Sequence, residues 1–262
     1  MDASLTDTAS AKAPIQGHHF SAQTSNVRHA WPNLPLCLDV WITSERSRAA
    51  HRSTTKANPT HPPQAPTAMS RPAIFVIDML NDCFGHAELQ RLRPSLCSSI
   101  NELTAIARAT GYPVIWVRQE FEPDLSDAML DMKSKNIHMF IKGTAGPLIL
   151  DELDRSDADL ELVKKRYSMF FQTGLDALLR QLGTDRIILA GVNTHACIRV
   201  AAVDAYQRDF EVMIVRECVA SKDAHHHEVT LDYLDGGVAR LVTLNEVKQQ
   251  FSRAALADDN AS

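Results

Sequence analysis

Residues 186–197 read RIILAGVNTHAC, and the interpretation of the whole chain starts from this stretch. A short apolar run at 186–190 leads through a turn to Cys197, at the start of a predicted helix over 196–207. A buried strand that passes through a turn into a helix is typical of the βαβ units of parallel sheets. The stretch therefore predicts an α/β fold with Cys197 near the carboxyl end of a strand.

The same alternation of apolar runs and amphipathic stretches continues over residues 71–262. Strands that are apolar throughout, rather than at every second position, favour a parallel sheet covered on both faces. We therefore predict a three-layer, doubly wound (Rossmann-like) α/β domain with a mostly parallel sheet. Its strands are expected at 73–77, 114–117, 160–163, 186–190, 211–215 and 240–242, and its helices at about 88–109, 174–182, 196–207, 225–235 and 245–255.

Residues 1–70 differ from the rest of the chain in composition. They hold seven of the twelve prolines and five of the eleven histidines, with no sustained hydrophobic period. Such a segment buries too little apolar surface to offset the entropy of ordering it, which predicts a disordered N-terminal extension. An organelle transit peptide and an extension upstream of an alternative start at Met69 remain open alternatives.

The overall composition argues against several classes of protein. Charged residues make up 23% of the chain and the net charge is −5, so a basic nucleic-acid-binding face is not expected. No apolar run approaches 18 residues, which argues against a membrane span. The cysteines are odd in number and scattered, which favours a reducing compartment, with a cytoplasmic location expected, over a disulfide framework. They are Cys37, Cys83, Cys97, Cys197 and Cys218.

Three reactive side chains stand at the ends of predicted strands. Asp78 follows the strand at 73–77, Lys164 follows the strand at 160–163, and Cys197 lies shortly after a third strand. Ligands of open parallel sheets bind outside the carboxyl ends of the strands. A carboxylate, an ammonium and a thiol are therefore expected to converge on one place.

This trio suits nucleophilic catalysis. A helix start and the cation of Lys164 are expected to lower the pKa of the Cys197 thiol, and Asp78 can take up its proton. Each residue also has an ordinary interpretation, as a buried apolar cysteine, a loop aspartate or a solvated lysine. Cys97 and Cys218 are assigned to such buried, unreactive positions.

Three longer segments, IDMLNDCF (77–84), VKKRYSMFFQTGLDALL (163–179) and LAGVNTHACIRVAAVDA (189–205), carry a family resemblance. They resemble the hallmark segments of the isochorismatase-like cysteine hydrolase superfamily, in order and spacing, and the resemblance covers about 73–245. It implies the isochorismatase-like hydrolase fold, a doubly wound parallel sheet. It also implies a catalytic triad of Asp78, Lys164 and Cys197.

The resemblance implies further details of the site. A cis peptide is expected between Val192 and Asn193, which directs the backbone amides of Asn193 and Cys197 at one oxyanion. Cys83 stands where the family usually has Phe. Nicotinamidase relatives carry metal-binding histidines after the second strand, whereas residues 117–130 here contain none, so neither a catalytic metal nor another cofactor is expected.

Four other residues are candidates for the substrate pocket. Phe84 and Tyr167 are expected as aromatic walls, unless they belong to the core. His195 either contacts substrate or caps the turn, and Gln119 is placed to hydrogen-bond an amide. The run His225–His227 cannot supply three ligands to one ion, because neighbours on a helix point about 100° apart; it is interpreted as a solvated helix start.

The remaining expectations concern function and assembly. The irregular segment 120–159 is predicted to act as a lid, and the resemblance implies a homo-oligomer. The predicted activity is hydrolysis of a C–N bond in a small amide or ureide through a thioester. The alternatives are an isochorismatase-type vinyl-ether hydrolase that releases pyruvate, a non-catalytic binding protein on the same fold, and a redox sensor that uses the same thiol.

The first prediction concerns the N-terminal segment. Deletion of residues 1–68 is expected to leave the thermal midpoint of unfolding nearly unchanged, because the segment is predicted to contribute no packed core. Thermal unfolding of the full and shortened chains, followed by circular dichroism, compares the two. A large drop in the midpoint would place the domain boundary upstream of residue 69.

Overall fold

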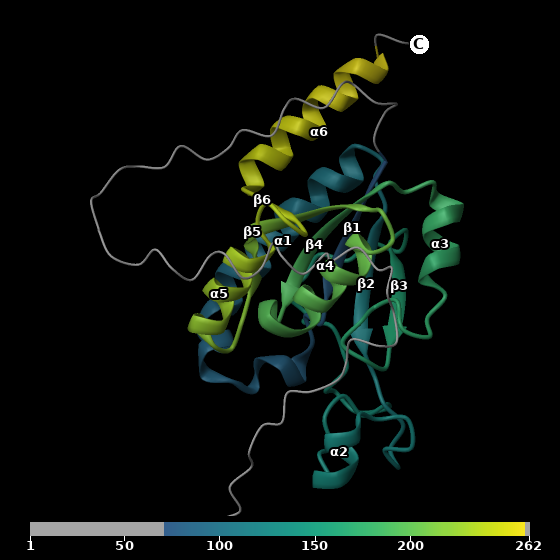
Figure 1. Ribbon diagram of the computed structural model, residues 1–262, viewed down its shortest axis with the longest axis vertical. Helices are drawn as coiled ribbons and strands as arrows, with labels where there is room; N and C mark the ends of the chain where they lie inside the picture. The colour runs from purple at the N-terminus through teal and green to yellow at the C-terminus, as the bar shows by residue number, and fades with distance from the viewer. Residues whose placement is uncertain (1–70, 260–262) are drawn as a thin grey trace, which may run out of the picture. The chain divides into compact units, whose positions relative to one another are not determined.

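The structure, a computed structural model, describes residues 71–259 (Figure 1). The predicted disordered extension at 1–70 lies outside the described residues. No helix within 71–259 is long and apolar enough to cross a membrane.

Strands and helices alternate along the described chain. The strands are β1 (Pro72–Ile77), β2 (Val114–Gln119), β3 (Leu160–Lys164), β4 (Arg186–Val192), β5 (Glu211–Ala220) and β6 (Arg240–Val242). The helices are η1 (Asn81–Gly85), α1 (Ala87–Ala109), α2 (Leu130–Lys135), α3 (Leu175–Leu182), η2 (Thr194–Ile198), α4 (Arg199–Tyr206), α5 (Ala224–Leu234) and α6 (Leu244–Asp259). All six predicted strands are present, and β2, β3, β4 and β5 extend beyond their predicted ends.

The strands form one six-stranded sheet in the order β3-β2-β1-β4-β5-β6. Every pairing is parallel, and Phe75 at the centre of β1 is in register with Ile115 of β2 and Leu189 of β4. The chain moves outward from β1 on one side and returns to add β4 on the other. The direction of winding therefore changes between β1 and β4, which is where doubly wound sheets bind ligands.

Two hydrophobic cores lie on the two faces of the sheet, and the alternation of side chains along β1 divides it between them. Ile74 and Val76 face the core that contains buried residues of α1 and α6. Ala73, Phe75 and Ile77 face the core that contains residues of α3, α4 and α5. The arrangement is the predicted three-layer α/β fold, with helices on both faces (Figure 1).

The long connection between β2 and β3 is more ordered than its sequence indicated. It contains the short helix α2 and a small core of its own, which the sequence did not predict. This core is made of Phe121, Leu125, Ala128, Met132 and Ile141. Figure 1 shows α2 standing apart from the sheet, beyond the carboxyl ends of the strands.

Gly191 allows β4 to approach β1 closely at the point where the winding changes. Its φ is +111°, and a Cβ atom at this position would lie 2.0 Å from the Ile77 carbonyl oxygen. Gly191 pairs with Ile77 in the sheet, and the next residue along β1 is Asp78. Only glycine fits this contact, so Gly191 fixes the distance between the ends of the two strands.

The replacement Gly191→Ala is expected to lower the free energy of unfolding by about 2–4 kcal/mol, because the methyl group clashes with backbone and the φ angle disfavours an L side chain. Denaturant unfolding measures the change. Gly85→Ala is the control, since a Cβ there meets nothing within 4 Å. Equal stability of the two variants would refute the close-contact explanation.

Candidate active site

Asp78 begins the site directly after β1. Its backbone N–H donates to the Val117 carbonyl at 2.8 Å, and its φ is +54°. This left-handed conformation is uncommon for residues other than glycine, although aspartate and asparagine tolerate it better than most. The turn directs the chain away from the sheet while the carboxylate stays buried, with 3% of the residue exposed.

Lys164, the last residue of β3, extends across the end of β2 to reach Asp78. Its Nζ lies 2.8 Å from Asp78 Oδ2 and 3.4 Å from Cys197 Sγ. It also donates to Gln119 Oε1 at 3.0 Å, at the end of β2, and to the Arg166 carbonyl at 3.3 Å. The lysine is completely buried. A single ammonium therefore connects the ends of β1, β2 and β3 with the cysteine.

The neighbouring Lys165 has a different role. Its Nζ pairs with Asp127 at 2.7 Å and donates to the Glu120 carbonyl at 2.6 Å. Arg166 also donates to the Asp127 carbonyl. These contacts hold the 120–159 connection against the loop after β3. Of the two adjacent lysines, Lys164 is the one that faces the cysteine.

Cys197 lies on η2, a single π-helical turn. The sequence had instead predicted a position in the first turn of a regular α-helix. The Val192–Asn193 peptide that precedes the turn is cis. The Asn193 carbonyl accepts hydrogen bonds from the N–H groups of Ala196 and Ile198, and the second of these spans five residues, as in a π-helix. The turn leaves Cys197 5% exposed, packed against the same core as Ile77.

The electrostatics of the trio differ from the sequence expectation for the thiol. Burial raises the pKa of Cys197 and the Asp78 carboxylate raises it further, and these effects outweigh the opposing influence of Lys164. Burial alone would lower the pKa of Lys164, but the charge of Asp78 reverses this and raises it. The surroundings of the trio thus favour the ammonium of Lys164 and disfavour the thiolate of Cys197. The expected lowering of the thiol pKa was wrong, because aspartate and desolvation act together against the thiolate.

Two buried polar atoms at the site have no hydrogen-bond partner in the described part of the chain. They are Asp78 Oδ1 and Gln119 Nε2. Buried polar groups are nearly always paired, so unpaired ones mark places where a ligand or proton is exchanged. Asp78 Oδ1 is an acceptor and Gln119 Nε2 is a donor, which is the complement of an amide group.

The other sequence-predicted pocket residues occupy varied positions. Phe84 is 4% exposed and packs in the core beneath α1, with Arg93 5.8 Å from its ring centroid. Tyr167, in the loop after β3, is 48% exposed, and burial raises the pKa of its hydroxyl group. His195 Nδ1 hydrogen-bonds Ser221 Oγ at 2.5 Å rather than the trio. The structure therefore gives Phe84 a core position and His195 a contact within the fold.

Two further residues concern the site, Cys83, which stands where the family usually has Phe, and His227, which was interpreted as part of a solvated helix start. Burial raises the pKa of the Cys83 thiol, and the charge of Asp78 raises it further. His227 turns inward and its Nδ1 lies 2.8 Å from Thr194 Oγ1, whereas the preceding histidines of the run are exposed as predicted. Between residues 71 and 259, no three His, Cys, Asp or Glu side chains are grouped to hold a metal ion.

Comparison with known proteins identifies the family. The family model for the isochorismatase domain matches residues 72–246. A probable inactive nicotinamidase of Arabidopsis thaliana is 30% identical over 189 residues, 69% of this chain and 96% of the relative. Maleamate amidohydrolase of Pseudomonas putida is 27% identical over 190 residues, 71% of this chain and 89% of that protein. The crystal structure of a cysteine hydrolase from Pseudomonas syringae pv. phaseolicola shares the fold, with a TM-score of 0.67, 22% identity and coverage of 73% of this chain and 97% of that one. The chain belongs to the isochorismatase family of hydrolases.

The buried ion pair generates a stability prediction. Lys164→Met is expected to lower the free energy of unfolding by about 3–5 kcal/mol, because it leaves the Asp78 carboxylate buried without its cation. The double variant Asp78→Asn/Lys164→Met should recover part of this loss, since asparagine is neutral and tolerates the same φ angle. Denaturant unfolding of the wild type, both single variants and the double variant measures the coupling, and strictly additive losses would contradict it.

Proposed function

We propose that this chain is a cysteine-dependent amidohydrolase that cleaves a C–N bond of a small amide or ureide through a thioester intermediate. One observation carries the proposal: the Lys164 ammonium lies 2.8 Å from Asp78 Oδ2 and 3.4 Å from Cys197 Sγ. A nucleophile beside a base and a cation is the arrangement that acyl transfer requires.

The first half of the reaction forms the thioester. Asp78 accepts the thiol proton through Oδ1, the oxygen that lacks a partner, and Cys197 becomes a thiolate beside Lys164. The sulfur attacks the substrate carbonyl carbon, and the backbone amides of Asn193 and Cys197 bind the oxyanion. When the C–N bond breaks, Asp78 returns the proton to the departing nitrogen, which leaves as ammonia or an amine.

The second half releases the acid. Asp78, again a carboxylate, removes a proton from water, and the hydroxide attacks the thioester carbonyl. The C–S bond breaks, and the proton held by Asp78 passes to the sulfur. The raised thiol pKa favours this last step, because it makes the protonated thiol the stable resting form. The buried site limits the water that competes with substrate in the first half.

The proposed substrate specificity rests on two side chains. Gln119 is held by its Oε1, which accepts from Lys164, so its Nε2 is turned to one direction as a donor. We propose that this donor contacts a polar group of the substrate other than the reacting carbonyl, whose oxygen is bound by the backbone amides of Asn193 and Cys197. Tyr167, half-exposed in the loop after β3, is the proposed aromatic wall.

The main alternative within the family is hydrolysis of a vinyl ether with release of pyruvate, which needs an acid but no sulfur nucleophile. A non-catalytic binding role is the second alternative, and the name of the Arabidopsis relative indicates that inactive proteins share this family. The contact of Cys197 Sγ with the same ammonium that pairs with Asp78 supports the amidase, because neither alternative requires a thiol at that point.

The activity is tested by incubating the protein with small amides and ureides, with maleamate among them, and with isochorismate. Release of ammonia from an amide is expected, and release of pyruvate from isochorismate would instead support the vinyl-ether reaction. Cys197→Ala and Asp78→Asn should each lower kcat by at least about 10³-fold while the protein remains folded. Enzymatic assays of ammonia and pyruvate give the rates.

Cys97→Ala is the matched control, because it removes a buried thiol from α1, away from the trio, and should keep the wild-type rate. A thioester adduct on Cys197, detected by mass spectrometry after acid quenching during turnover, would support the covalent step. Undiminished turnover by Cys197→Ala would overturn it.

A further inference from the structure

The turn that carries Cys197 is bound from behind by the connection between β5 and α5. The side chains of three successive residues, 193–195, each form a hydrogen bond with this connection or with α5. Lys222 N–H donates to Asn193 Oδ1 at 2.9 Å, and Thr194 Oγ1 lies 2.8 Å from His227 Nδ1. The third contact is that of His195 Nδ1 with Ser221 Oγ at 2.5 Å. Cys197 of this turn contacts Lys164, whereas residues 193–195 are hydrogen-bonded to the segment that follows β5 and to α5.

Two of the three bonds, Thr194 with His227 and His195 with Ser221, join two partly buried side chains, and the first of these involves the residue of the turn that is completely buried. Thr194 is completely buried, and it stands three positions before the cysteine. His227 is on the first turns of α5, and the side chain of the histidine is 20% exposed. Loss of this bond would leave the Thr194 hydroxyl group without a hydrogen-bond partner. Water is not expected to take the partner's place, because Thr194 is completely buried.

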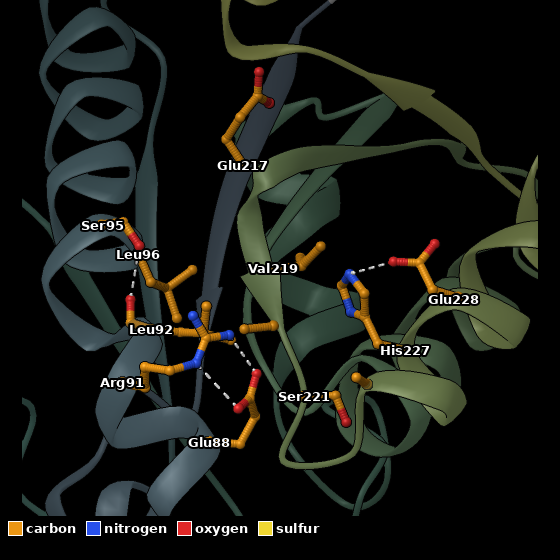
Figure 2. A pocket seen from close by; sticks show the side chains of 12 residues that line it. Glu88, Arg91, Leu92, Ser95, Leu96, Glu217, Val219, Ser221, His227 and Glu228 are labelled. Carbon is orange, nitrogen blue, oxygen red and sulfur yellow. Dashed lines mark hydrogen bonds and ion pairs between the residues drawn. The ribbon is translucent and has the colours of Figure 1, made fainter.

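The other side of His227 faces a crevice of about 290 Å³ between α1 and the β5–α5 connection. Figure 2 shows the His227 ring at its edge, with its Nε2 toward Glu228 and with Arg91 and Glu88 paired on the α1 side. Glu228 Oε1 lies 4.0 Å from Nε2, beyond hydrogen-bond distance. The bond between Nδ1 and the Thr194 hydroxyl group forms in either neutral tautomer, because a hydroxyl group can donate or accept.

The surroundings of His227 favour its neutral form. Burial lowers its pKa from the ordinary value, against the smaller opposing influence of Glu228, and Arg216 lowers it further. A neutral ring offers one nitrogen as a donor and the other as an acceptor, so it can pair with the Thr194 hydroxyl group.

We propose that His227 is a positioning residue, which holds the Cys197 turn against Asp78 and Lys164 through its hydrogen bond to Thr194. This inference rests on the proposed function, because it assigns a role in placing the nucleophile. The Sγ atom works only within contact distance of the ammonium and the carboxylate, and misplacement by about 1 Å can cost up to about 10²-fold in rate. The turn follows β4 and leads directly into α4, and its side-chain bonds to the β5–α5 connection and α5 add to these two anchors.

The experiment compares His227→Ala, His227→Asn and Thr194→Val with the wild type. Asparagine can place an amide atom near the position of Nδ1, and valine keeps the shape of threonine without the hydroxyl. Amide hydrogen exchange of the peptide that contains residues 194–198 reports the order of the turn without any substrate. Kinetics on the amide that the wild type hydrolyses fastest, with maleamate as the first probe, report kcat and KM separately.

His227→Ala and Thr194→Val are each expected to speed exchange in the turn and to lower kcat about tenfold, with KM within about twofold. The double variant should lose no more than either single variant, because both remove the same bond. His227→Asn should recover most of kcat. His225→Ala, on the exposed side of α5, is the control and should match the wild type in both measurements.

Other outcomes separate the two proposals. Unchanged exchange in both single variants, or faster exchange with a wild-type kcat, would overturn the positioning role. Losses that add in the double variant would overturn it as well, because they would show that the two side chains act independently. If Cys197→Ala still turned over substrate, the covalent mechanism would fail instead, whatever the exchange showed. Thr194→Val keeps the test decisive should His227→Ala not fold.

Discussion

The buried ion pair between Asp78 and Lys164 is the constraint on which the site depends. Two charges removed from water destabilise a fold unless each meets its partner in good geometry. The strand order places β2 between the two residues, so the pair forms only because the long lysine side chain passes over the end of β2. There the Lys164 ammonium donates a hydrogen bond to Gln119 Oε1. The sheet, the charges and the amide donor are therefore parts of one arrangement.

The cysteine is placed by contacts on two sides. Lys164 and Asp78 set its charge environment on one side, and on the other side Thr194 of the turn is hydrogen-bonded to His227 of α5. The charge of Asp78 raises the pKa of the thiol, whereas that of Lys164 lowers it. In the proposed mechanism the aspartate then has two opposite effects, because its charge opposes the thiolate and its carboxylate takes up the thiol proton.

The sequence was sufficient for the fold because its information is local. Apolar runs such as AIFVI before Asp78 and RIILA before the Cys197 turn identify central strands, and parallel winding brings their carboxyl ends to one edge. Contacts between side chains were less accessible. Nothing in the pattern shows that Gln119 meets Lys164, or that one histidine of three turns inward, since these depend on strand order and helix rotation. The thiol pKa was mispredicted for the same reason, because burial is a property of the assembled fold.

The lysine that spans β2 also has a consequence for the order in which the chain acquires its structure. During synthesis β1 and β2 emerge long before β3, so an early intermediate already holds the Asp78 carboxylate but has no ammonium to accompany it. Burial of the Asp78 carboxylate at this stage would leave an unpaired negative charge in an apolar environment. The carboxyl ends of β1 and β2 are therefore expected to remain hydrated until β3 pairs with β2. Assembly of the reactive centre and final exclusion of solvent from the sheet edge then become a single late event.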